Sequence, residues 1–451
     1  MSKISTSFYE NVVYPVYQFK FGFKFGFEVI KTLRQITKYQ WVSRDELLAF
    51  QTKKLKRLIQ HAYDNVTYYR EVMEKLDLKP EDIKSVEDIK YLPLLTKEEI
   101  RKNQEKFVSK DIRNRNTIPG STGGSTGEPL KFVRDWNTHI WTEAALLRGM
   151  SWAQFRIGDT FIDFMSPGWP SILGKIRTRM IGRYCFPALA KYDVLASYMK
   201  KIKGYRPFCL AGYTSNLYRI AKTCHKRGIN DIEIPVIFTT AEMLYDFQRD
   251  FLEKQFNSSV FDYYGCNELG SIAFECEYKN KHISNEHVIV ETTNSKGDPV
   301  INSLGEITVT DLDNYAMPFI RYKIGDTGII PNDVCACGRS LKIIKSIDGR
   351  TQEFLRTLDG NYVPAVFFPA RFRNLVGIDQ YQIVQTDIHV IVLKIVKNRC
   401  FSARELEGMM QIIREMIGND ITITVEEHRS IPLTRRGKVR LVMTNLKIEL
   451  L

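Results

Sequence analysis

The sequence predicts an α/β protein with a large layered domain followed by a smaller α+β domain. Helical patterns fill the first hundred residues, short apolar β-prone runs alternate with helical stretches from about 115 to 350, and a new pattern begins after Gly349-Arg350. A chain of 451 residues is also longer than one ordinary hydrophobic core accommodates. We therefore expect residues 1–100 to form the helical part of the large domain, residues 101–350 its α/β core, and residues 351–451 the small domain.

Two capping boxes mark helices in the first hundred residues. In Ser43-Arg44-Asp45-Glu46 and Thr96-Lys97-Glu98-Glu99, the hydroxyl can accept from the amide three residues on, while the glutamate accepts from the amide of the capping residue. Apolar residues behind the first box keep the spacing of one helix face: Leu47, Phe50, Leu55, Leu58, Ile59 and Ala62. Both segments are therefore expected to be helical.

Short β-prone runs outline the core and the small domain. Runs at 161–165, 235–239 and 306–310 are separated by helical stretches, and this alternation is typical of layered α/β folds. In the last hundred residues we expect strands at 381–384, 389–395 and 421–425 and a helix at 402–416. These elements are enough for a small α+β domain.

The composition indicates a soluble globular protein. Hydrophobic residues make up 44% and charged residues 26% of the chain, which excludes a disordered polymer. Lys and Arg outnumber Asp and Glu by 65 to 52, but the excess is spread along the chain, so a nucleic-acid partner is not expected. Eight cysteines in a chain of this length do not indicate a disulfide scaffold. Because we find neither a signal peptide nor eighteen consecutive apolar residues, we expect a cytoplasmic protein without a membrane span.

Aromatic and basic residues alternate near the N-terminus. Phenylalanine recurs at every second position from Phe19 to Phe27, with Lys20, Gly22, Lys24 and Gly26 between. One interpretation is a peripheral membrane contact through residues 1–30, with the aromatic rings in and the lysines out. The other is an arm packed on its own protein, for which the strict alternation fits a strand at least as well as a helix. Aromatic stripes usually belong to a core, which favours the second interpretation.

The strongest chemical signal is a loop from Ser121 to Gly127, with the sequence STGGSTG. Three glycines allow close approach of the backbone to a ligand, and four hydroxyls supply donors that can wrap phosphate oxygens. The loop is not the P-loop of common NTPases, because no Gly-Lys-Ser/Thr follows. The alternative is a flexible linker.

Four further stretches carry chemically suggestive residues in order. Residues 263–268 (YYGCNE) end a predicted strand with an aromatic ring, a glycine and a carboxylate, and residues 321–328 (RYKIGDTG) put Asp326 in a turn flanked by glycines, which suits a sugar diol. Residues 347–350 stand at the domain junction. Residues 432–440 (PLTRRGKVR) place Lys438 after a glycine in an exposed turn.

Taken in this order, the motifs resemble those of the adenylate-forming, acyl-CoA synthetase-like superfamily. More narrowly, the chain resembles the phenylacetate–coenzyme A ligase family and its relatives encoded with capsular polysaccharide genes. The resemblance begins in residues 55–69 and 92–97 and extends to Lys438, so it covers nearly the whole chain. It implies a large layered α/β N-terminal domain and a small mobile α+β C-terminal domain.

The resemblance also implies a role for each matching residue. The loop would hold the β- and γ-phosphates of ATP through Ser121, Thr122, Gly123, Gly124, Ser125, Thr126 and Gly127. The adenine pocket would comprise Tyr264, stacked near the ring, with Ala241, Glu242, Gly265 and Asn267. The residues nearest the chemistry would be Glu268 on Mg²⁺, Asp326 on the ribose hydroxyls, Arg350 near the ribose and phosphate, and Lys438 on the α-phosphate and acyl oxygen.

These roles suit a ligase that joins a carboxylic acid to an acceptor through an acyl-adenylate. A carboxylate meets an anionic α-phosphate while pyrophosphate departs, so Mg²⁺, Lys438 and the loop donors must neutralise charge. In the family, rotation of the small domain then exposes the adenylate to coenzyme A. Common members carry two acids two residues after the junction arginine, whereas this chain has Gln352 at the hinge position. The alternatives are therefore transfer to an amine, giving an amide in capsular polysaccharide biosynthesis, and an inactive relative that serves as a binding protein.

Cysteine and histidine spacing predicts a structural zinc site. Cys276, His282, Cys335 and Cys337 can supply three thiolates and an imidazole, a closed tetrahedral set. His287 is the alternative fourth ligand, and buried free thiols or a redox pair are the alternatives to zinc. Such a site would be structural rather than catalytic, because no open coordination position is implied.

The identity of the acid is not encoded in a motif. Its pocket is expected between residues 166–169, the 211–215 loop and the 239–242 turn, where Trp169, Tyr213 and Phe238 would suit an aryl group. Cys266 lies in the nucleotide motif, where a small residue suffices, and a nucleophilic role is not favoured. No histidine pairs visibly with an acid and a serine, so a hydrolase has no support.

Overall fold

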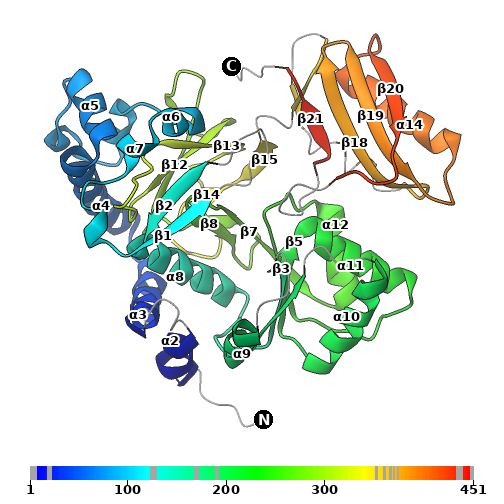
Figure 1. Cartoon of the computed structure of the whole chain (residues 1–451), viewed down its shortest axis with the longest axis horizontal. Coiled ribbons are helices and arrows are strands. Elements are labelled where there is room, and N and C mark those ends of the chain that lie inside the picture. The colour runs from blue at the N-terminus through cyan, green and yellow to red at the C-terminus, as the bar shows by residue number, and fades with distance from the viewer. Residues whose placement is uncertain are drawn as a thin grey trace.

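The structure is a computed structural model that describes residues 8–17, 23–121, 130–166, 172–187, 192–350, 354–358, 362–364, 368, 371–372, 375–432 and 440–446. Within these residues, an N-terminal helical region leads into two large sheets with helices around them, and a separate four-stranded sheet follows (Figure 1). The predicted α/β class is confirmed. Among the described residues, no helix combines the length and the apolar character needed to cross a bilayer.

Helices dominate the first hundred residues, as predicted. They are α2 (Tyr14–Tyr17), α3 (Phe23–Tyr39), α4 (Arg44–Asn65), α5 (Thr67–Lys75), α6 (Lys97–Lys102) and α7 (Gln104–Phe107), with a π-helical turn η1 (Tyr9–Val13) and 3₁₀ turns η3 (Pro80–Asp82), η4 (Glu87–Tyr91) and η5 (Ile112–Asn114). Both capping boxes form: Ser43 begins α4 and accepts from the amide of Glu46 at 3.2 Å, and Thr96 begins α6 and accepts from Glu99 at 3.2 Å. Each cap satisfies an amide that has no partner inside its helix.

The N-terminal arm is helical from Phe23 onward, so of the strand and the helix that its alternation fitted, the helix forms and the strand is wrong. In a helix, residues two apart point to different sides. Accordingly Phe25 is 1% exposed and Phe27 is 52% exposed. Val29, Ile30 and Ile36 join Phe25 in an apolar cluster against α8 (Trp136–Trp152), which confirms that the described part of the arm packs on its own protein.

An eight-stranded mixed sheet forms the centre of the large domain. Its strand order is β14-β9-β8-β7-β6-β5-β3-β4, in which β4, β3, β5, β6 and β7 are parallel and β8, β9 and β14 antiparallel. The strands are β3 (Phe161–Ser166), β4 (Arg183–Pro187), β5 (Cys209–Tyr213), β6 (Val236–Thr240), β7 (Ser259–Cys266), β8 (Gly270–Glu275), β9 (Lys281–Ile283) and β14 (Ile343–Ile344). The helices α9 (Ile172–Met180), α10 (Tyr192–Tyr205), α11 (Thr214–Lys226) and α12 (Asp246–Phe256) connect the parallel strands. The strands predicted at 161–165 and 235–239 are thus confirmed.

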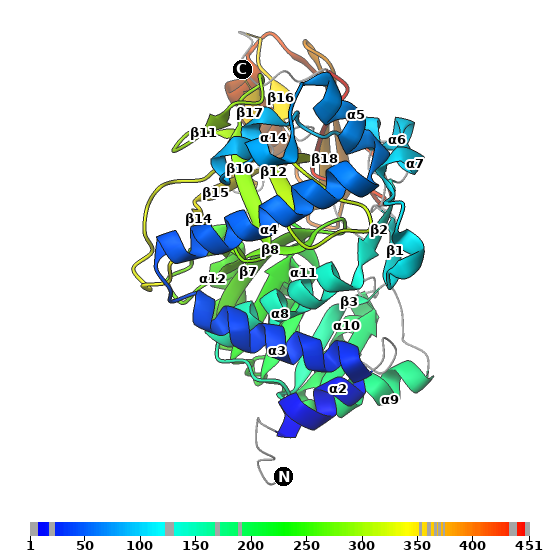
Figure 2. The same ribbon diagram turned by 90° about the vertical axis from the view of Figure 1, so that its left-hand side faces the viewer.

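A five-stranded antiparallel sheet lies beside the first. Its order is β11-β10-β12-β13-β15, and the strands are β10 (Val288–Thr293), β11 (Pro299–Val300), β12 (Gly305–Asp311), β13 (Tyr322–Ile329) and β15 (Ser346–Arg350). The α4 helix runs across β10 and β12 (Figure 2), where Gln51 donates to the carbonyl of Val288 at 3.1 Å. A separate hairpin pairs β1 (Thr117–Ser121) with β2 (Lys131–Asp135).

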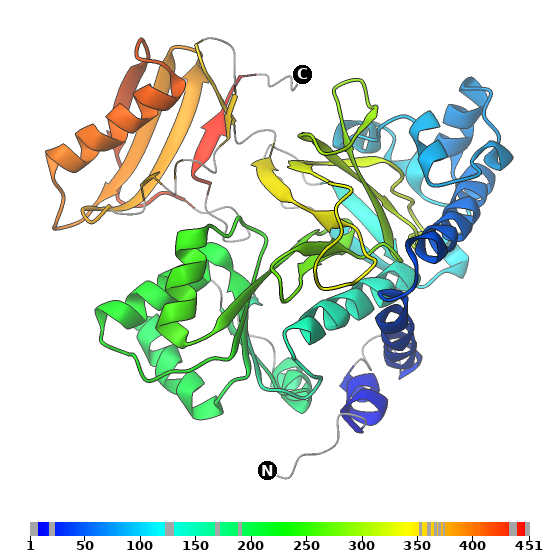
Figure 3. The same cartoon turned by 180° about the vertical axis from the view of Figure 1, so that it is seen from behind.

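The C-terminal part has a hydrophobic core of its own. Its sheet has the order β20-β19-β18-β21, with β18 (Ile378–Asp387), β19 (Val390–Lys397), β20 (Thr422–Glu427) and β21 (Val442–Thr444). The helix α14 (Ala403–Ile417) covers one face (Figure 3), and the pair β16 (Phe354–Arg356) and β17 (Tyr362–Pro364) precedes the sheet. Every buried residue of this core lies between Leu355 and Val442. The three strands and the helix predicted here are confirmed.

Candidate active site

Two of the predicted nucleotide motifs meet between neighbouring sheets. The hydroxyl of Tyr264 on β7 donates a hydrogen bond of 2.7 Å to Oδ2 of Asp326 on β13. The motif 263–268 ends β7, as expected, but one local expectation was wrong, because Asp326 lies on a strand rather than in an open turn. Gly325 has a left-handed φ of +89°, and the β12–β13 register shifts across it, between the pairs Thr308–Lys323 and Glu306–Thr327. This irregularity replaces the predicted turn.

The predicted magnesium ligand, Glu268, lies buried in the turn after β7 and is 4% exposed. Its Oε1 accepts from the Tyr322 hydroxyl at 2.9 Å and lies 3.6 Å from the ammonium of Lys97. Burial raises the pKa of Tyr322, so its hydroxyl stays protonated and donates. We did not predict a role for Lys97 or Tyr322, although both lie in stretches that carry the family resemblance.

A pairing between distant segments brings Lys97 to this site. Leu95 forms a parallel bridge with Tyr322, and its amide donates to the carbonyl of Arg321 at 3.0 Å. The capping box at Thr96 then starts α6, so Lys97 is its first residue. The capping box in the sequence predicts where α6 begins. It does not predict that the preceding Leu95 pairs with a strand more than two hundred residues later, which is what brings Lys97 to Glu268.

Arg350 and Asp326 are direct partners on neighbouring strands. They face each other in the β13–β15 ladder, and the structure describes the backbone of Arg350 only. Opposite residues of an antiparallel pair lie about 4.5–5.5 Å apart, so both residues belong to one small region. Asp326, predicted to bind the ribose, and Arg350, predicted to lie near the phosphate, therefore occupy neighbouring backbone positions.

The 241–242 turn reaches the same region from β6. Ala241 has a left-handed φ of +68°, and Glu242 Oε2 accepts from the amide of Ser215 at 2.8 Å. Thr240 donates to the carbonyl of Tyr263 at 3.1 Å, which fixes the turn beside β7. Gly265 cannot carry a side chain here, since a Cβ would lie 2.3 Å from the carbonyl oxygen of Gly270. Asn267, the other residue predicted for the adenine pocket, is exposed.

Several predicted residues lie outside the described part of the chain. These are Thr122, Gly123, Gly124, Ser125, Thr126 and Gly127 of the loop, Trp169, the hinge residue Gln352, and Lys438. Ser121 is described: it is exposed at the end of β1 and pairs with Lys131 across the hairpin. The predicted phosphate loop therefore joins the two strands of a β-hairpin.

The four predicted metal ligands converge in one buried cluster. Sulfur or ring nitrogen atoms of Cys276, His282, Cys335 and Cys337 all lie within 4.8 Å of one another. Cys276 Sγ is 3.7 Å from Cys335 Sγ, and Cys337 Sγ is 3.2 Å from His282 Nε2. Burial lowers the pKa of His282 to about 4, so its imidazole is neutral at pH 7, the form that binds a metal.

His287, the alternative fourth ligand, belongs to a different buried network. Its Nδ1 lies 2.8 Å from Asp313 Oδ2, which also accepts from the ammonium of Lys54 at 2.6 Å. Lys54 and Asp313 join α4 to the segment after β12. The structure thus selects His282 for the cluster with the cysteines.

Cys266 lies on β7 beside the nucleotide motif. Burial raises the pKa of its thiol well above the usual value. A buried thiol in this state is a poor nucleophile. The structure therefore supports the sequence interpretation of Cys266 as a small packing residue.

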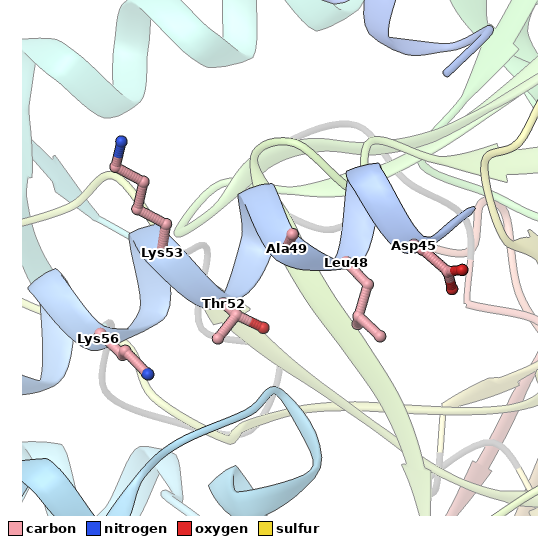
Figure 4. Close-up of a pocket in the computed structure, with 6 residues that line it drawn as sticks. All are labelled: Asp45, Leu48, Ala49, Thr52, Lys53 and Lys56. Atoms are coloured by element: carbon pink, nitrogen blue, oxygen red, sulfur yellow. The ribbon is translucent and has the colours of Figure 1, made fainter. Parts of the chain in front are cut away.

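Two hollows are found in the described part of the structure. One, of about 540 Å³, follows a single face of α4 and is lined by Asp45, Leu48, Ala49, Thr52, Lys53 and Lys56 (Figure 4). One helix face cannot enclose a small molecule, so we assign it no ligand. The other, of about 170 Å³, lies between α8 and β3, β5, β6 and β7, and Ala211 and Phe238 of the predicted acid pocket line it.

Comparisons with known proteins agree with the motif order. A family model described as the CapK C-terminal domain matches residues 355–445. Protein CapK of Staphylococcus aureus is 26% identical, over 94% of this chain and 93% of that protein. Phenylacetate–coenzyme A ligase of Thermus thermophilus is 23% identical, over 71% of this chain and 74% of its own length. The chain is a CapK-like protein of the phenylacetate–coenzyme A ligase family.

A solved structure shows the same fold. The structure of 2-hydroxyisobutyryl-CoA ligase in the postadenylation state, in complex with R3-HIB-AMP, superposes with a TM-score of 0.73. The match covers 90% of this chain and 91% of that chain at 16% sequence identity. This CapK-like protein therefore has the fold of the adenylate-forming CoA ligases, with a large N-terminal α/β domain and a C-terminal domain.

Proposed function

We propose that the protein activates a small carboxylic acid with ATP as an acyl-adenylate and transfers the acyl group to coenzyme A. The proposal rests mainly on β13, because Asp326 and Tyr322 of this strand contact Tyr264 and Glu268 from the other motif. The contacts lie near the carboxyl ends of the parallel strands β5, β6 and β7, where open α/β sheets bind ligands. An enzyme that consumes ATP and coenzyme A is expected in the cytoplasm.

In the first half-reaction, an oxygen of the acid attacks the α-phosphorus of ATP. A new P–O bond forms, and the bond to the bridging oxygen breaks as pyrophosphate leaves with the electron pair. Glu268 would hold Mg²⁺, which supplies positive charge against the phosphate oxygens. Lys438 and the donors from Ser121 to Gly127 would hold the acyl and phosphate oxygens, and Asp326 would orient the ribose.

In the second half-reaction, the sulfur of coenzyme A attacks the acyl carbon. A C–S bond forms, the bond from the acyl carbon to the phosphate oxygen breaks, and AMP leaves, while water takes the thiol proton. Gln352 at the hinge position bears on this step, because common family members have an acid there. An amine acceptor would follow the same course with nitrogen in place of sulfur, and it remains the second candidate.

We also propose that the four-residue cluster holds a structural zinc ion. Tetrahedral Zn²⁺ with Zn–S bonds of about 2.3 Å separates two thiolate sulfurs by roughly 3.8 Å. The sulfurs of Cys276 and Cys335 are 3.7 Å apart. Leu341 accepts at 3.1 Å from the other ring nitrogen of His282, an orientation typical of metal-bound histidine. Because all four ligands come from the protein, the site would be closed and non-catalytic.

The assay for the proposed function follows AMP and pyrophosphate with ATP, Mg²⁺ and pooled aryl, fatty, amino and uronic acids. Acid-dependent AMP formation that Lys438→Ala abolishes is the expected result. Repeating the assay with coenzyme A and with amines then separates thioester from amide synthesis. Formation of ADP in place of AMP would refute the adenylate mechanism, and ATP binding without turnover would favour the inactive binding protein.

A further inference from the structure

The cavity of about 170 Å³ is mostly apolar and lies between α8 and the central sheet. Leu146, Leu147 and Met150 of α8 face Phe161, Ala211 and Phe238 of the central sheet across it. Met165 and Tyr263, which also line it, lie near the carboxyl ends of β3 and β7. Tyr263 and Tyr264 are consecutive on β7, so their side chains face opposite sides of the sheet. Ala211 and Phe238 belong to the predicted acid pocket, and we therefore take this cavity as the acid pocket of the proposed function.

The size of the cavity limits what it can hold. An apolar cavity of about 150 Å³ in a protein binds benzene. A cavity of about 170 Å³ thus accommodates a group of roughly six or seven non-hydrogen atoms. Long acyl chains are too large for the cavity as it stands.

The charged groups that line the cavity restrict the choice of ligand more than its volume does. Arg183 at one end pairs with the buried carboxylate of Asp163, with its Nε 3.1 Å from Oδ2. Glu143 on α8 also lines the cavity, is half-buried, and accepts from the Tyr14 hydroxyl at 3.4 Å, a long hydrogen bond. Arg134 on β2 is close enough for its charge to act on Glu143, but among the described residues no lysine or arginine nitrogen forms an ion pair with this carboxylate within 4.0 Å. A carboxylate in a largely apolar cavity favours a ligand group that donates a hydrogen bond.

We propose that the acid activated by this protein is a compact amino or hydroxy acid whose ammonium or hydroxyl group donates to Glu143. This inference rests on the proposed function and names the substrate class within it. An acid without a donor brings its own carboxylate into the same small site as Glu143 and carries no group of its own that offsets the repulsion. An amino acid supplies the compensating positive charge itself.

The N-terminal arm completes this site. Tyr14 belongs to α2, is 3% exposed, and lines the cavity next to Glu143. Its hydroxyl donates to Oε2 of Glu143 and so fixes the orientation of that carboxylate. Tyr14 is therefore a positioning residue, and the aromatic N-terminal arm contributes to the choice of substrate.

Matched acids provide the test. AMP formation is measured with phenylpropanoate against phenylalanine, and with phenylacetate against para-hydroxyphenylacetate. We expect the donor-bearing acid of each pair to have a kcat/KM about tenfold higher, the size of effect of one hydrogen bond to a charged group. Glu143→Gln should remove the preference for phenylalanine, by lowering the kcat/KM for phenylalanine and raising that for phenylpropanoate, with the KM for ATP unchanged. Tyr14→Phe should reduce the preference in part.

The control is Glu28→Gln, which removes an exposed carboxylate that pairs with Lys31 on α3 and should leave the preference intact. Equal loss of turnover with every acid in Glu143→Gln would overturn the proposal, because a purely structural role predicts that result. If the wild-type protein forms no AMP with any acid, the proposed function fails, and calorimetric titration with the same four acids decides the inference. Binding of phenylalanine that Glu143→Gln loses supports it, and equal binding within both pairs, or none, overturns it.

Discussion

The hydrogen bond of 2.7 Å from the Tyr264 hydroxyl to Asp326 joins two motifs that are 62 residues apart. The bond holds Oδ2 of the carboxylate, so the orientation of Asp326 does not depend on a ligand being bound. Asp326 is also the ladder partner of Arg350. One side-chain contact and one strand pairing therefore fix the relative positions of three residues that the sequence assigns to the nucleotide.

Removing that hydroxyl should weaken ATP use without unfolding the protein. A hydrogen bond to a charged group contributes about 1.5–3 kcal/mol, but water can replace part of it here, so we expect Tyr264→Phe to raise the KM for ATP roughly fivefold. Asp326→Asn should raise it further. The control is Tyr91→Phe, which removes the hydroxyl of a ring that is 53% exposed. An unchanged KM for ATP in Tyr264→Phe would contradict the positioning role.

Lys97 and Glu268 should have opposite effects on the magnesium requirement. The ammonium of Lys97, 3.6 Å from Glu268, competes with a cation for that carboxylate. Lys97→Met should therefore lower the Mg²⁺ concentration at half-maximal AMP formation, and Glu268→Gln should raise it about tenfold or more. The measurement is a magnesium titration at saturating ATP. Shifts of the same sign in both variants would show that the two residues do not share a cation site.

Removal of the proposed zinc should destabilise the region around β9 and β14. Metal analysis of the purified protein should give one zinc per chain, and Cys335→Ser should lose it. A chelator should lower the melting temperature of the wild-type protein, because metal binding contributes to folding. Cys400→Ser, at an exposed thiol far along the sequence, is the matched control and should retain the metal. Full retention of zinc in Cys335→Ser would exclude the cluster as its site.

A fully buried ion pair should be sensitive to the loss of one partner. Arg148 of α8 pairs with Glu286, and both side chains are 1% exposed. Glu286→Gln should cost about 3–5 kcal/mol in the free energy of unfolding, because it leaves a buried guanidinium without its counter-charge. The double variant Arg148→Met/Glu286→Leu should be less destabilised than the single one. Denaturant unfolding checks this order, and equal losses would contradict it.

A peripheral membrane contact through the N-terminal arm is still a prediction, and the exposed face of α3 is where it can be tested. Lys24, Phe27, Lys31, Arg34 and Lys38 recur along one exposed face of this helix. If the contact exists, co-sedimentation with phosphatidylserine vesicles should decline in Lys24→Glu/Lys31→Glu, because each lysine near an anionic surface contributes about 1 kcal/mol. Lys53→Glu/Lys56→Glu on α4 makes the same change of net charge elsewhere. Equal loss in both double variants would indicate only non-specific attraction.

Local chemistry in the sequence predicted the helices, strands and ligand types that depend on neighbouring residues. The caps at Ser43 and Thr96 form because all their atoms lie within four residues. The arm was harder, since Phe19 to Phe27 alone fits a period of two. The helical spacing continues through Val29, Ile30 and Ile36, and that longer window carried the deciding signal.

Long-range pairing accounts for what the sequence did not reveal. Lys97 reaches Glu268 only because Leu95 pairs with Tyr322. The choice between His282 and His287 likewise depends on the pairing of β9 with β14, which places His282 opposite Ile343, a few residues after Cys335 and Cys337. Glu143 had no motif around it, because its importance comes from a cavity whose walls derive from seven separate helices and strands.

The topology of the last sheet has a mechanical consequence for Lys438. Strands β20 and β21 occupy opposite edges, and the segment 428–441 between them must cross three strand spacings, or about 14 Å. Lys438 lies outside the described residues, but in the chain it falls between two strands of one sheet rather than beyond the last strand. Losing β21 would remove one of the two anchors of this segment, and if Lys438 acts on the α-phosphate as proposed, its effective concentration there would fall even though the residue itself was still present.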